Sequence, residues 1–415
     1  MAEMRFRPVL VLVALWLIVP TIACGQARAP AQTREGRFLE ALRQRGYFEY
    51  AQLYLDELEK NPSASAAVKA VVSYERAITF LEAGRAAASP TEKTPLYDKA
   101  VGFLDQFVKA NPNHALAADA NSQRGQILLG KARVEIWYSQ SPSNSANRVT
   151  FQEDGRKQVL AARKIFQTAH DQYQKAWKVF PTFLDRVQQA DLYEKRKRAE
   201  LLYMRAQYDL ALCTYEEAQT HDRGSPPYIK LATRAAGEFE MIHTRYRSVV
   251  VGLYARMWQG KCYEEQDDIN KALGIYKELL GHPGGSATMR TIQDQVLLFM
   301  LICLNHEEKQ DYLLVINQST EWIRQRTSRQ RRAPHALGIL WEQVLAQEAL
   351  AVERTLPEKD RNQVLSAALA NCRFIQRWPS KYKDVALFKM RELQVRLKGE
   401  ATDPQDFDSA FGLAH

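Results

Sequence analysis

Glycine and proline are scarce in this chain. It has 19 Gly and 16 Pro in 415 residues, which is about 8% against a usual share of about 12%. Collagen-like and low-complexity chains need far more of both residues, and β-sandwiches place turn residues every 8–12 positions or so. Hydrophobic residues make up 46% of the chain, which is enough for a large core. The composition therefore favours a folded, mainly helical protein.

Long hydrophobic runs are also lacking, with one exception near the N-terminus. Eleven apolar residues extend from Val9 to Val19, whereas a bilayer-spanning helix needs about 20. Arg5 and Arg7 precede this run, and Pro20 with several small residues follows it. A positive start, a short apolar run and a small-residue end are typical of a secretory signal peptide. We expect residues 1–23 to be removed on export.

Residue patterns for chemistry are missing as well. The eight histidines include no pair three or four positions apart, and no Cys-x-x-Cys, P-loop, Gly-x-Ser-x-Gly or Gly-x-Gly-x-x-Gly pattern occurs. We therefore predict no catalytic, metal-binding or cofactor-binding residues, no cofactor, and no enzyme activity. Four of the five cysteines are expected to be small buried hydrophobic residues: Cys213, Cys262, Cys303 and Cys372.

The net charge of +9 comes from 57 basic and 48 acidic residues spread over the chain. In one cluster, Lys195 to Arg198, the four cations radiate around a predicted helix and favour a solvated helix surface. The other cluster has five arginines and no acid within nine residues: Arg324, Arg326, Arg329, Arg331 and Arg332. It is either a solvated loop or a patch for an anionic partner, such as lipid headgroups, an acidic protein or glycan phosphate. Export disfavours nucleic acid as that partner.

From residue 34 onward the apolar residues keep helical spacing. One pattern, with apolar residues at offsets 0, 3, 4, 7, 10 and 11 and often a proline near offset 15, recurs along the chain. Its copies begin at Phe48, Tyr97, Phe166, Ala232, Ile269, Tyr312 and Leu365. Further helical stretches alternate with the copies: Ser65 to Leu81, Ala115 to Trp137, Arg186 to Glu217, Val249 to Glu265, Thr288 to Cys303 and Lys381 to Leu397. The repeating unit is thus predicted to be a helical hairpin, and the fold to be all-α.

The repeats resemble the tetratricopeptide repeat (TPR) superfamily. Gly260, Tyr263, Ala272 and Tyr276 occupy that family's small, aromatic, alanine and aromatic positions. Residues of other copies that share these packing roles are Ala100, Leu104, Ala169, Tyr173 and Ala176. The resemblance implies an α-solenoid of about seven irregular TPR-like helical hairpins over residues 35–398.

A narrower resemblance is to TPR proteins and lipoproteins of bacterial envelopes. Thr21-Ile22-Ala23-Cys24 is similar to a lipoprotein cleavage box, in which the cysteine becomes the acylated first residue. Cys24 is accordingly the lipidation candidate. The other interpretation is ordinary cleavage after Ala23 or Ala27, which leaves a free periplasmic protein. Residues 24–34 and 399–415 are expected to form a mobile linker and a mobile tail.

These observations favour a non-catalytic protein-binding scaffold of the bacterial cell envelope. The resemblance implies that the concave face of the solenoid binds a protein or peptide, and anionic lipid is a further candidate partner. The alternative is a structural subunit of an assembly complex, tethered to the outer membrane through a lipidated Cys24.

Overall fold

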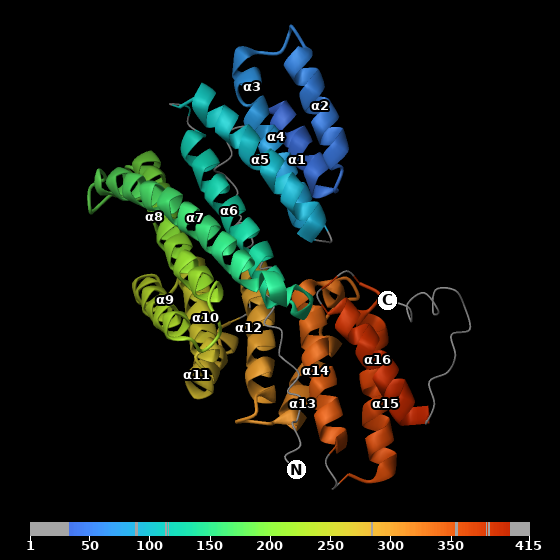
Figure 1. The fold of residues 1–415 in the computed structure, drawn as a ribbon. Coiled ribbons are helices and arrows are strands. Elements are labelled where there is room, and N and C mark those ends of the chain that lie inside the picture. Colours follow the sequence, from blue (N-terminus) through green and yellow to red (C-terminus); the bar gives the residue numbers. More distant parts are fainter. Residues whose placement is uncertain are drawn as a thin grey trace. The chain divides into compact units, whose positions relative to one another are not determined.

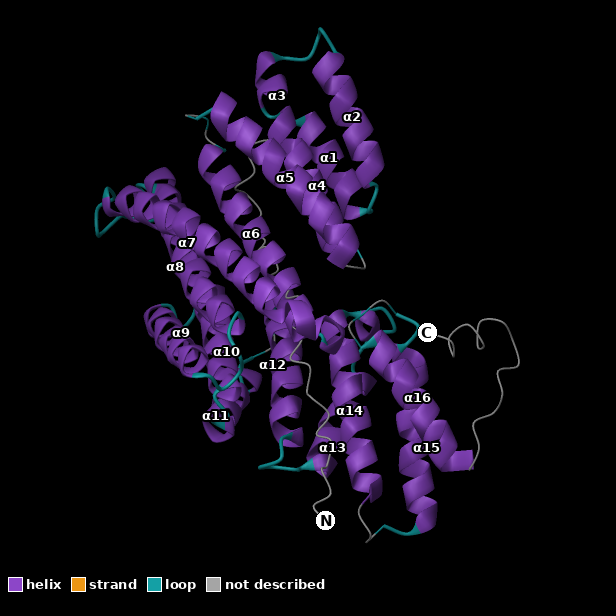
Figure 2. Ribbon diagram, in the orientation of Figure 1, coloured by secondary structure: helices purple, strands orange, loops and turns teal. Residues whose placement is uncertain are grey.

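The computed structural model describes residues 33–398, except for 88–89, 113, 115, 284, 353–355, 379 and 381. The predicted signal peptide, Cys24 and the predicted tail after residue 398 lie outside the described residues. Helices account for all regular structure in the described ranges, as Figure 2 shows. The prediction of an all-α fold is confirmed.

The described chain divides into two units at Tyr246 and Arg247. The first unit contains helices α1 to α9 and one 3₁₀ turn: α1 Arg34–Gln44, α2 Phe48–Lys60, α3 Ala66–Ala70, α4 Val72–Ala86, α5 Pro90–Ala110, α6 Ala117–Gln140, η2 Pro142–Asn147, α7 Arg148–Lys178, α8 Ala190–Gln219 and α9 Pro226–Arg245. The second unit contains the remaining elements: α10 Val250–Glu265, α11 Ile269–Leu280, α12 Ala287–Asn305, α13 Tyr312–Arg324, η3 Gln330–Arg332, α14 Pro334–Val352, α15 Glu358–Ile375 and α16 Lys383–Lys398.

Consecutive helices pair into hairpins along each unit (Figure 1). The pairs are α1–α2, α4–α5, α6–α7, α8–α9, α10–α11, α12–α13 and α14–α15, and α16 packs on α15. Each of the seven predicted repeat copies falls in the second helix of one pair. First helices of successive pairs also contact each other, as α10 contacts α12 and α12 contacts α14. Stacking of this kind buries a continuous core along each unit.

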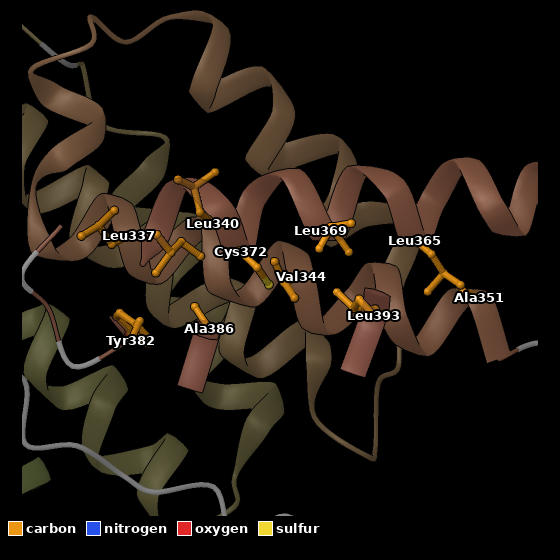
Figure 3. Packing of buried hydrophobic residues seen from close by; sticks show 12 residues of the cluster. Leu337, Leu340, Val344, Ala351, Leu365, Leu369, Cys372, Tyr382, Ala386 and Leu393 are labelled. Atoms are coloured by element: carbon orange, nitrogen blue, oxygen red, sulfur yellow. The ribbon is translucent and has the colours of Figure 1, made fainter. Parts of the chain in front are cut away.

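The final hairpin and α16 show how the core is built (Figure 3). Leu337, Leu340 and Val344 of α14 meet Leu369 and Cys372 of α15, and all five side chains are buried. Tyr382, Ala386 and Leu393 close the cluster from the α16 side. The apolar positions recur every three or four residues, so each helix presents one continuous stripe to its neighbours.

The turn into the second helix follows one backbone geometry in four hairpins. The residue two positions before the helix has a positive φ: Gly46 (77°), Gly224 (76°), Asp267 (59°) and Gln310 (46°). In two of these turns the next residue caps the helix, because Asp268 accepts from the Lys271 amide and Asp311 from the Leu314 amide, both at 3.3 Å. Glycine adopts positive φ at little cost, whereas Asp267 and Gln310 do so against the usual preference.

Two predicted helix boundaries were wrong. The stretch from Ser65 to Leu81 is two helices, because Val71 has φ −102° and ψ 0° between α3 and α4. The stretch predicted from Arg186 begins only at Ala190, because the preceding residues form a turn around Asp185. In addition, α7 has 31 residues and starts well before the repeat copy at Phe166.

Among the described helices, α12 at Ala287–Asn305 is long and apolar enough to span a bilayer by length and composition alone. Of its most apolar window, 67% is buried within the folded chain. It contacts α10, α11, α13 and α14. The helix therefore serves as a core helix of the second unit.

Candidate interaction surfaces

The predicted small positions let neighbouring helices approach closely. A Cβ atom built on Gly260 of α10 would lie 2.6 Å from Cε1 of Tyr276 on α11. A Cβ atom built on Gly125 of α6 would likewise lie 2.7 Å from Cε1 of the Phe166 ring on α7. Real Cβ atoms do not occupy such positions, so glycine is required at these contacts unless the aromatic ring moves.

The other predicted packing residues differ in their burial. Ala100, Leu104, Ala169 and Ala272 are buried, as are Gly260 and Tyr276. Tyr263 and Tyr173 are half-buried, and Ala176 is exposed.

The exposure of Ala176 follows from the face that α7 turns toward α8. Gln174 Nε2 donates to the Tyr203 hydroxyl of α8 at 2.9 Å. The Trp177 ring stacks on Tyr203, with ring centroids 5.6 Å apart. Ala176 lies on a different side of the helix, so the prediction that it packs between helices was wrong.

The first hairpin carries an open cavity of about 800 Å³. Phe38 of α1 and Tyr54 of α2 meet edge to face in its wall, with centroids 4.8 Å apart. The lining also includes charged side chains of both signs: Arg34, Glu35, Glu57 and Lys60. Burial and the Glu35 carboxylate raise the pKa of Tyr54, against a smaller opposing effect of Arg34. The cavity thus offers an aromatic wall with polar groups around it.

Exposed apolar side chains continue from this cavity along α2. Phe38 is 47% exposed, Tyr50 65% and Leu53 59%. Tyr47, Tyr50 and Tyr54 follow one another at helical spacing and share one face of α2. We call these five residues the α2 stripe: Phe38, Tyr47, Tyr50, Leu53 and Tyr54. Terminal hairpins of repeat proteins usually carry a polar outer face. The exposed apolar side chains of the α2 stripe depart from this rule.

The arginine segment is only partly solvated. Arg326 Nη2 bonds to Asp294 Oδ1 of α12 at 2.6 Å, and Trp322 Nε1 donates to the same oxygen at 2.6 Å. His335 Nε2 lies 3.6 Å from the other carboxylate oxygen. Burial opposes the negative charge of Asp294, but these partners outweigh it and lower its pKa. Arg326 therefore joins the segment to the core of the second unit.

The remaining arginines of the segment have different environments. Arg331 is half-buried, and its Nε donates to the Arg326 carbonyl at 3.1 Å. The Arg332 guanidinium stacks over Trp378, 4.2 Å from the ring centroid. Arg324, Arg329 and Arg332 are exposed. An anionic partner could reach these three, so the segment does not present five equivalent cations.

We expect Arg326→Gln to lower the free energy of unfolding by about 1–3 kcal/mol, because the buried Asp294 loses its charged partner. The difference should be largest at neutral pH and should close as the pH falls below about 4, where Asp294 in the unfolded chain is protonated. Thermal or urea unfolding of the full chain measures it. Arg329→Gln is the matched control and should change stability by about 0.5 kcal/mol or less; equal losses in both variants would contradict the role of Asp294.

The order and packing of the helices decide the fold. Paired helices follow the chain, first helices contact first helices, and glycines meet aromatic rings between the partners. The fold is a TPR-like array of helical hairpins.

The sequence matches no protein-family model and no curated protein. Among solved structures, the crystal structure of the P58(IPK) TPR domain is similar over 88% of this chain and 99% of that chain, with 14% identity and a TM-score of 0.27.

The TPR-like hairpins of the first unit are tied together by buried polar pairs. Arg133 Nε of α6 bonds to Glu216 Oε1 of α8 at 2.7 Å. Seven positions earlier on each helix, Gln126 Nε2 donates to Asp209 Oδ1 at 2.8 Å. Burial raises the pKa of Asp209 to about 6, against the opposing effect of Arg205. Two equally spaced pairs specify the register of α6 against α8.

In the second unit a buried lysine joins three TPR-like helices. Lys261 of α10 pairs with Glu264 and with Glu265, the latter at 3.0 Å. The Tyr276 hydroxyl of α11 donates to Glu264 Oε2 at 3.0 Å. The Lys261 ammonium also lies 5.3 Å from the ring centroid of Phe299 on α12. Burial raises the pKa of Glu264 although Lys261 opposes this shift.

Cys213, Cys262, Cys303 and Cys372 are free and buried, as expected. Burial raises the pKa of Cys372 to about 12 and also raises the pKa values of Cys213 and Cys303. Among the described residues, no group of three His, Cys, Asp or Glu side chains is placed to hold a metal ion.

Two exposed apolar surfaces were not predicted from the sequence. The α2 stripe has an amphipathic signal, since Tyr47, Tyr50 and Tyr54 repeat at helical spacing beside the buried face of Ala51, Leu55 and Leu58. The second surface is the connection between α7 and α8, where apolar residues are exposed beside cations. Apolar residues normally predict burial, so composition alone could not distinguish these surfaces from core.

Proposed function

We propose that this chain is a non-catalytic protein-binding scaffold of the bacterial cell envelope, and that the first hairpin is its principal binding surface. The α2 stripe and its cavity carry the proposal. Contiguous exposed apolar surface rimmed by polar groups is typical of a protein-interaction site. The few residues that dominate binding at such sites are enriched in tyrosine, tryptophan and arginine.

The partner of this surface is an amphipathic peptide segment of an envelope protein. Phe38 and Tyr54 would contact its apolar side chains. Arg34 and Lys60 would pair with its acidic groups, and Glu35 and Glu57 with its basic groups. The mixed charge favours a partner of mixed charge over a strongly acidic or basic one.

The test compares three full-length chains as baits in solubilised envelopes. Peptides from the captured protein are then titrated against each chain. We expect the Tyr50→Ser/Leu53→Ser double variant to bind at least about tenfold more weakly than the unaltered chain, because two exposed apolar contacts are lost. Leu313→Ser is the matched control, since Leu313 is 61% exposed on another hairpin.

Binding of isolated peptides that the double variant abolishes supports the scaffold. Capture of a fixed complex whose isolated segments do not bind, with no effect of the double variant, favours the tethered structural subunit instead.

Export and tethering belong to the same proposal. The apolar run at Val9–Val19 and the sequence Thr21-Ile22-Ala23-Cys24 support them. Mass spectrometry of the mature N-terminus tests them, since an acylated Cys24 means membrane tethering and a free N-terminus at Cys24 or Arg28 means a free periplasmic protein. Recovery of intact Met1 in cytoplasmic material would contradict both.

A further inference from the structure

The connection between α7 and α8 exposes three apolar side chains to solvent. Phe183 is 90% exposed, Val187 87% and Val179 82%, and no other large hydrophobic residue in the described ranges is as exposed. All three lie within nine residues of one another, where the two long helices meet (Figure 1). We call residues 179–189 the α7–α8 tip. Such exposure costs solubility unless the surface has a partner.

The α7–α8 tip has a defined local structure. The Asp185 carboxylate accepts from the amides of Val187 and Gln188, at 2.8 and 2.7 Å. Gln189 Oε1 accepts from the Asp185 amide at 3.1 Å, and Arg196 donates to the Thr182 carbonyl. These bonds hold the backbone on both sides of Phe183. The apolar side chains are therefore presented outward by an ordered turn.

Positive charge surrounds the α7–α8 tip. Residues 175–198 contain seven cations and three acids: Lys175, Lys178, Arg186, Lys195, Arg196, Lys197 and Arg198, against Asp185, Asp191 and Glu194. The Asp185 carboxylate already accepts hydrogen bonds from two amides of the turn. Lys195, Lys197 and Arg198 are exposed on α8. The apolar side chains thus project beyond a collar of cations.

The positions of these cations favour a membrane surface over a groove of a protein as the partner of the α7–α8 tip. Lys195 to Arg198 radiate around the α8 axis, so they cannot face one side of a protein partner together. They do share one height, about 7–12 Å from the start of α8 at 1.5 Å per residue. If α7 and α8 enter a bilayer end-on, the exposed Lys195, Lys197 and Arg198 would lie in the phosphate layer. Apolar groups of interfacial segments bury about 5–10 Å deep, a distance of the same order.

We propose that the α7–α8 tip inserts into the surface of an anionic phospholipid bilayer. Phe183, Val187 and Val179 enter the acyl boundary, and the surrounding lysines and arginines pair with lipid phosphates. Attraction between cations and anionic lipid adds to the apolar contribution. This contact is separate from acylation at Cys24 and from the α2 stripe.

The experiment places an environment-sensitive fluorophore on the tip. In the full chain carrying Cys24→Ala, Phe183→Cys is labelled with NBD; the four remaining cysteines are buried and slow to react. Met241→Cys on α9 is the matched control, because Met241 is 67% exposed in the same unit. We expect a blue shift at position 183, and none at 241, when phosphatidylglycerol-containing vesicles are added. Phosphatidylcholine vesicles should give a much smaller shift.

Two further measurements test the roles of charge and apolar contact. Lys195→Gln/Lys197→Gln/Arg198→Gln should weaken vesicle binding, because these exposed cations face the lipid phosphates. Rising salt should weaken binding of the unaltered chain, because exposed charges are screened. Phe183→Ser/Val187→Ser should lower vesicle partitioning by about tenfold or more. No shift at 183 with anionic vesicles at low salt, or equal shifts at 183 and 241, overturns the proposal. A shift produced by soluble envelope protein and not by vesicles also overturns it and assigns the tip to a protein partner.

Discussion

Lys261→Met is expected to lower the free energy of unfolding of the second unit by about 3–5 kcal/mol. The substitution leaves Glu264 and Glu265 buried without their cation, and an uncompensated buried charge is among the most destabilising changes in a protein. Lys261 and Glu265 are 2% and 1% exposed, so solvent cannot replace the lost partner. Urea unfolding followed by circular dichroism measures the loss. Lys271→Met is the matched control, since Lys271 pairs with Asp268 at the surface.

The same variant should show a characteristic pH dependence. Burial already raises the pKa of Glu264, and loss of Lys261 removes the effect that opposes this shift. A folded-state pKa above the unfolded value means that the folded chain binds more protons, so stability rises as the pH falls toward the unfolded pKa of about 4.3. The deficit should therefore shrink at low pH. Adding Glu264→Gln and Glu265→Gln should recover much of the stability at neutral pH; no recovery would mean that the lysine acts through packing alone.

Gly125→Ala should destabilise the first unit by about 1–3 kcal/mol although alanine favours helices. Its Cβ would lie 2.7 Å from two atoms of the Phe166 ring, which is 1% exposed and has little room to move. Overpacking of this kind usually outweighs the gain in helix propensity of about 0.5–1 kcal/mol. Thermal unfolding of the full chain measures the effect.

Gly102→Ala is the matched control for this substitution. No atom lies within 4 Å of the Cβ position at Gly102 on α5, so only the propensity gain remains. That variant should be stabilised. Combining Gly125→Ala with Phe166→Leu should remove part of the clash, and a double variant no better than the sum of its single changes would show that the ring is not the obstacle.

The repeated offsets located the second helix of each hairpin because burial imposes helical spacing on those positions. The copy at Ile269 coincides with the first residue of α11, and the copy at Tyr312 with the first residue of α13. Local geometry was harder to predict. The type of Gln310 does not indicate a positive φ, and that of Asp267 indicates one only weakly, because aspartate is enriched in this region but rarely adopts it. The turn imposes the geometry at both residues.

Long-range partners and exposure were the least predictable features. Arg326 looked like part of a solvated cluster because its acid, Asp294, lies 32 positions away in sequence. The exposure of Phe183 was not predicted, because phenylalanine is usually buried. The turn around Asp185 exposes this side chain. That turn depends on hydrogen bonds, which produce no periodic pattern in the sequence. The α2 stripe could have been recognised from the tyrosine spacing, but only by knowing which face of α2 the rest of the unit covers.

The packing of each helix on its near neighbours in sequence has a mechanical consequence. Within each unit a hairpin is held mainly by the hairpins before and after it, so stability is close to a sum of local terms. Tension along the chain can therefore detach an end hairpin while the others stay folded. The extension of each unit under force should then proceed in steps of one hairpin, at lower force than a fold whose ends are joined by distant contacts. If the chain is anchored at a membrane and bound to a partner, as proposed above, it would lengthen in steps under tension without losing either contact.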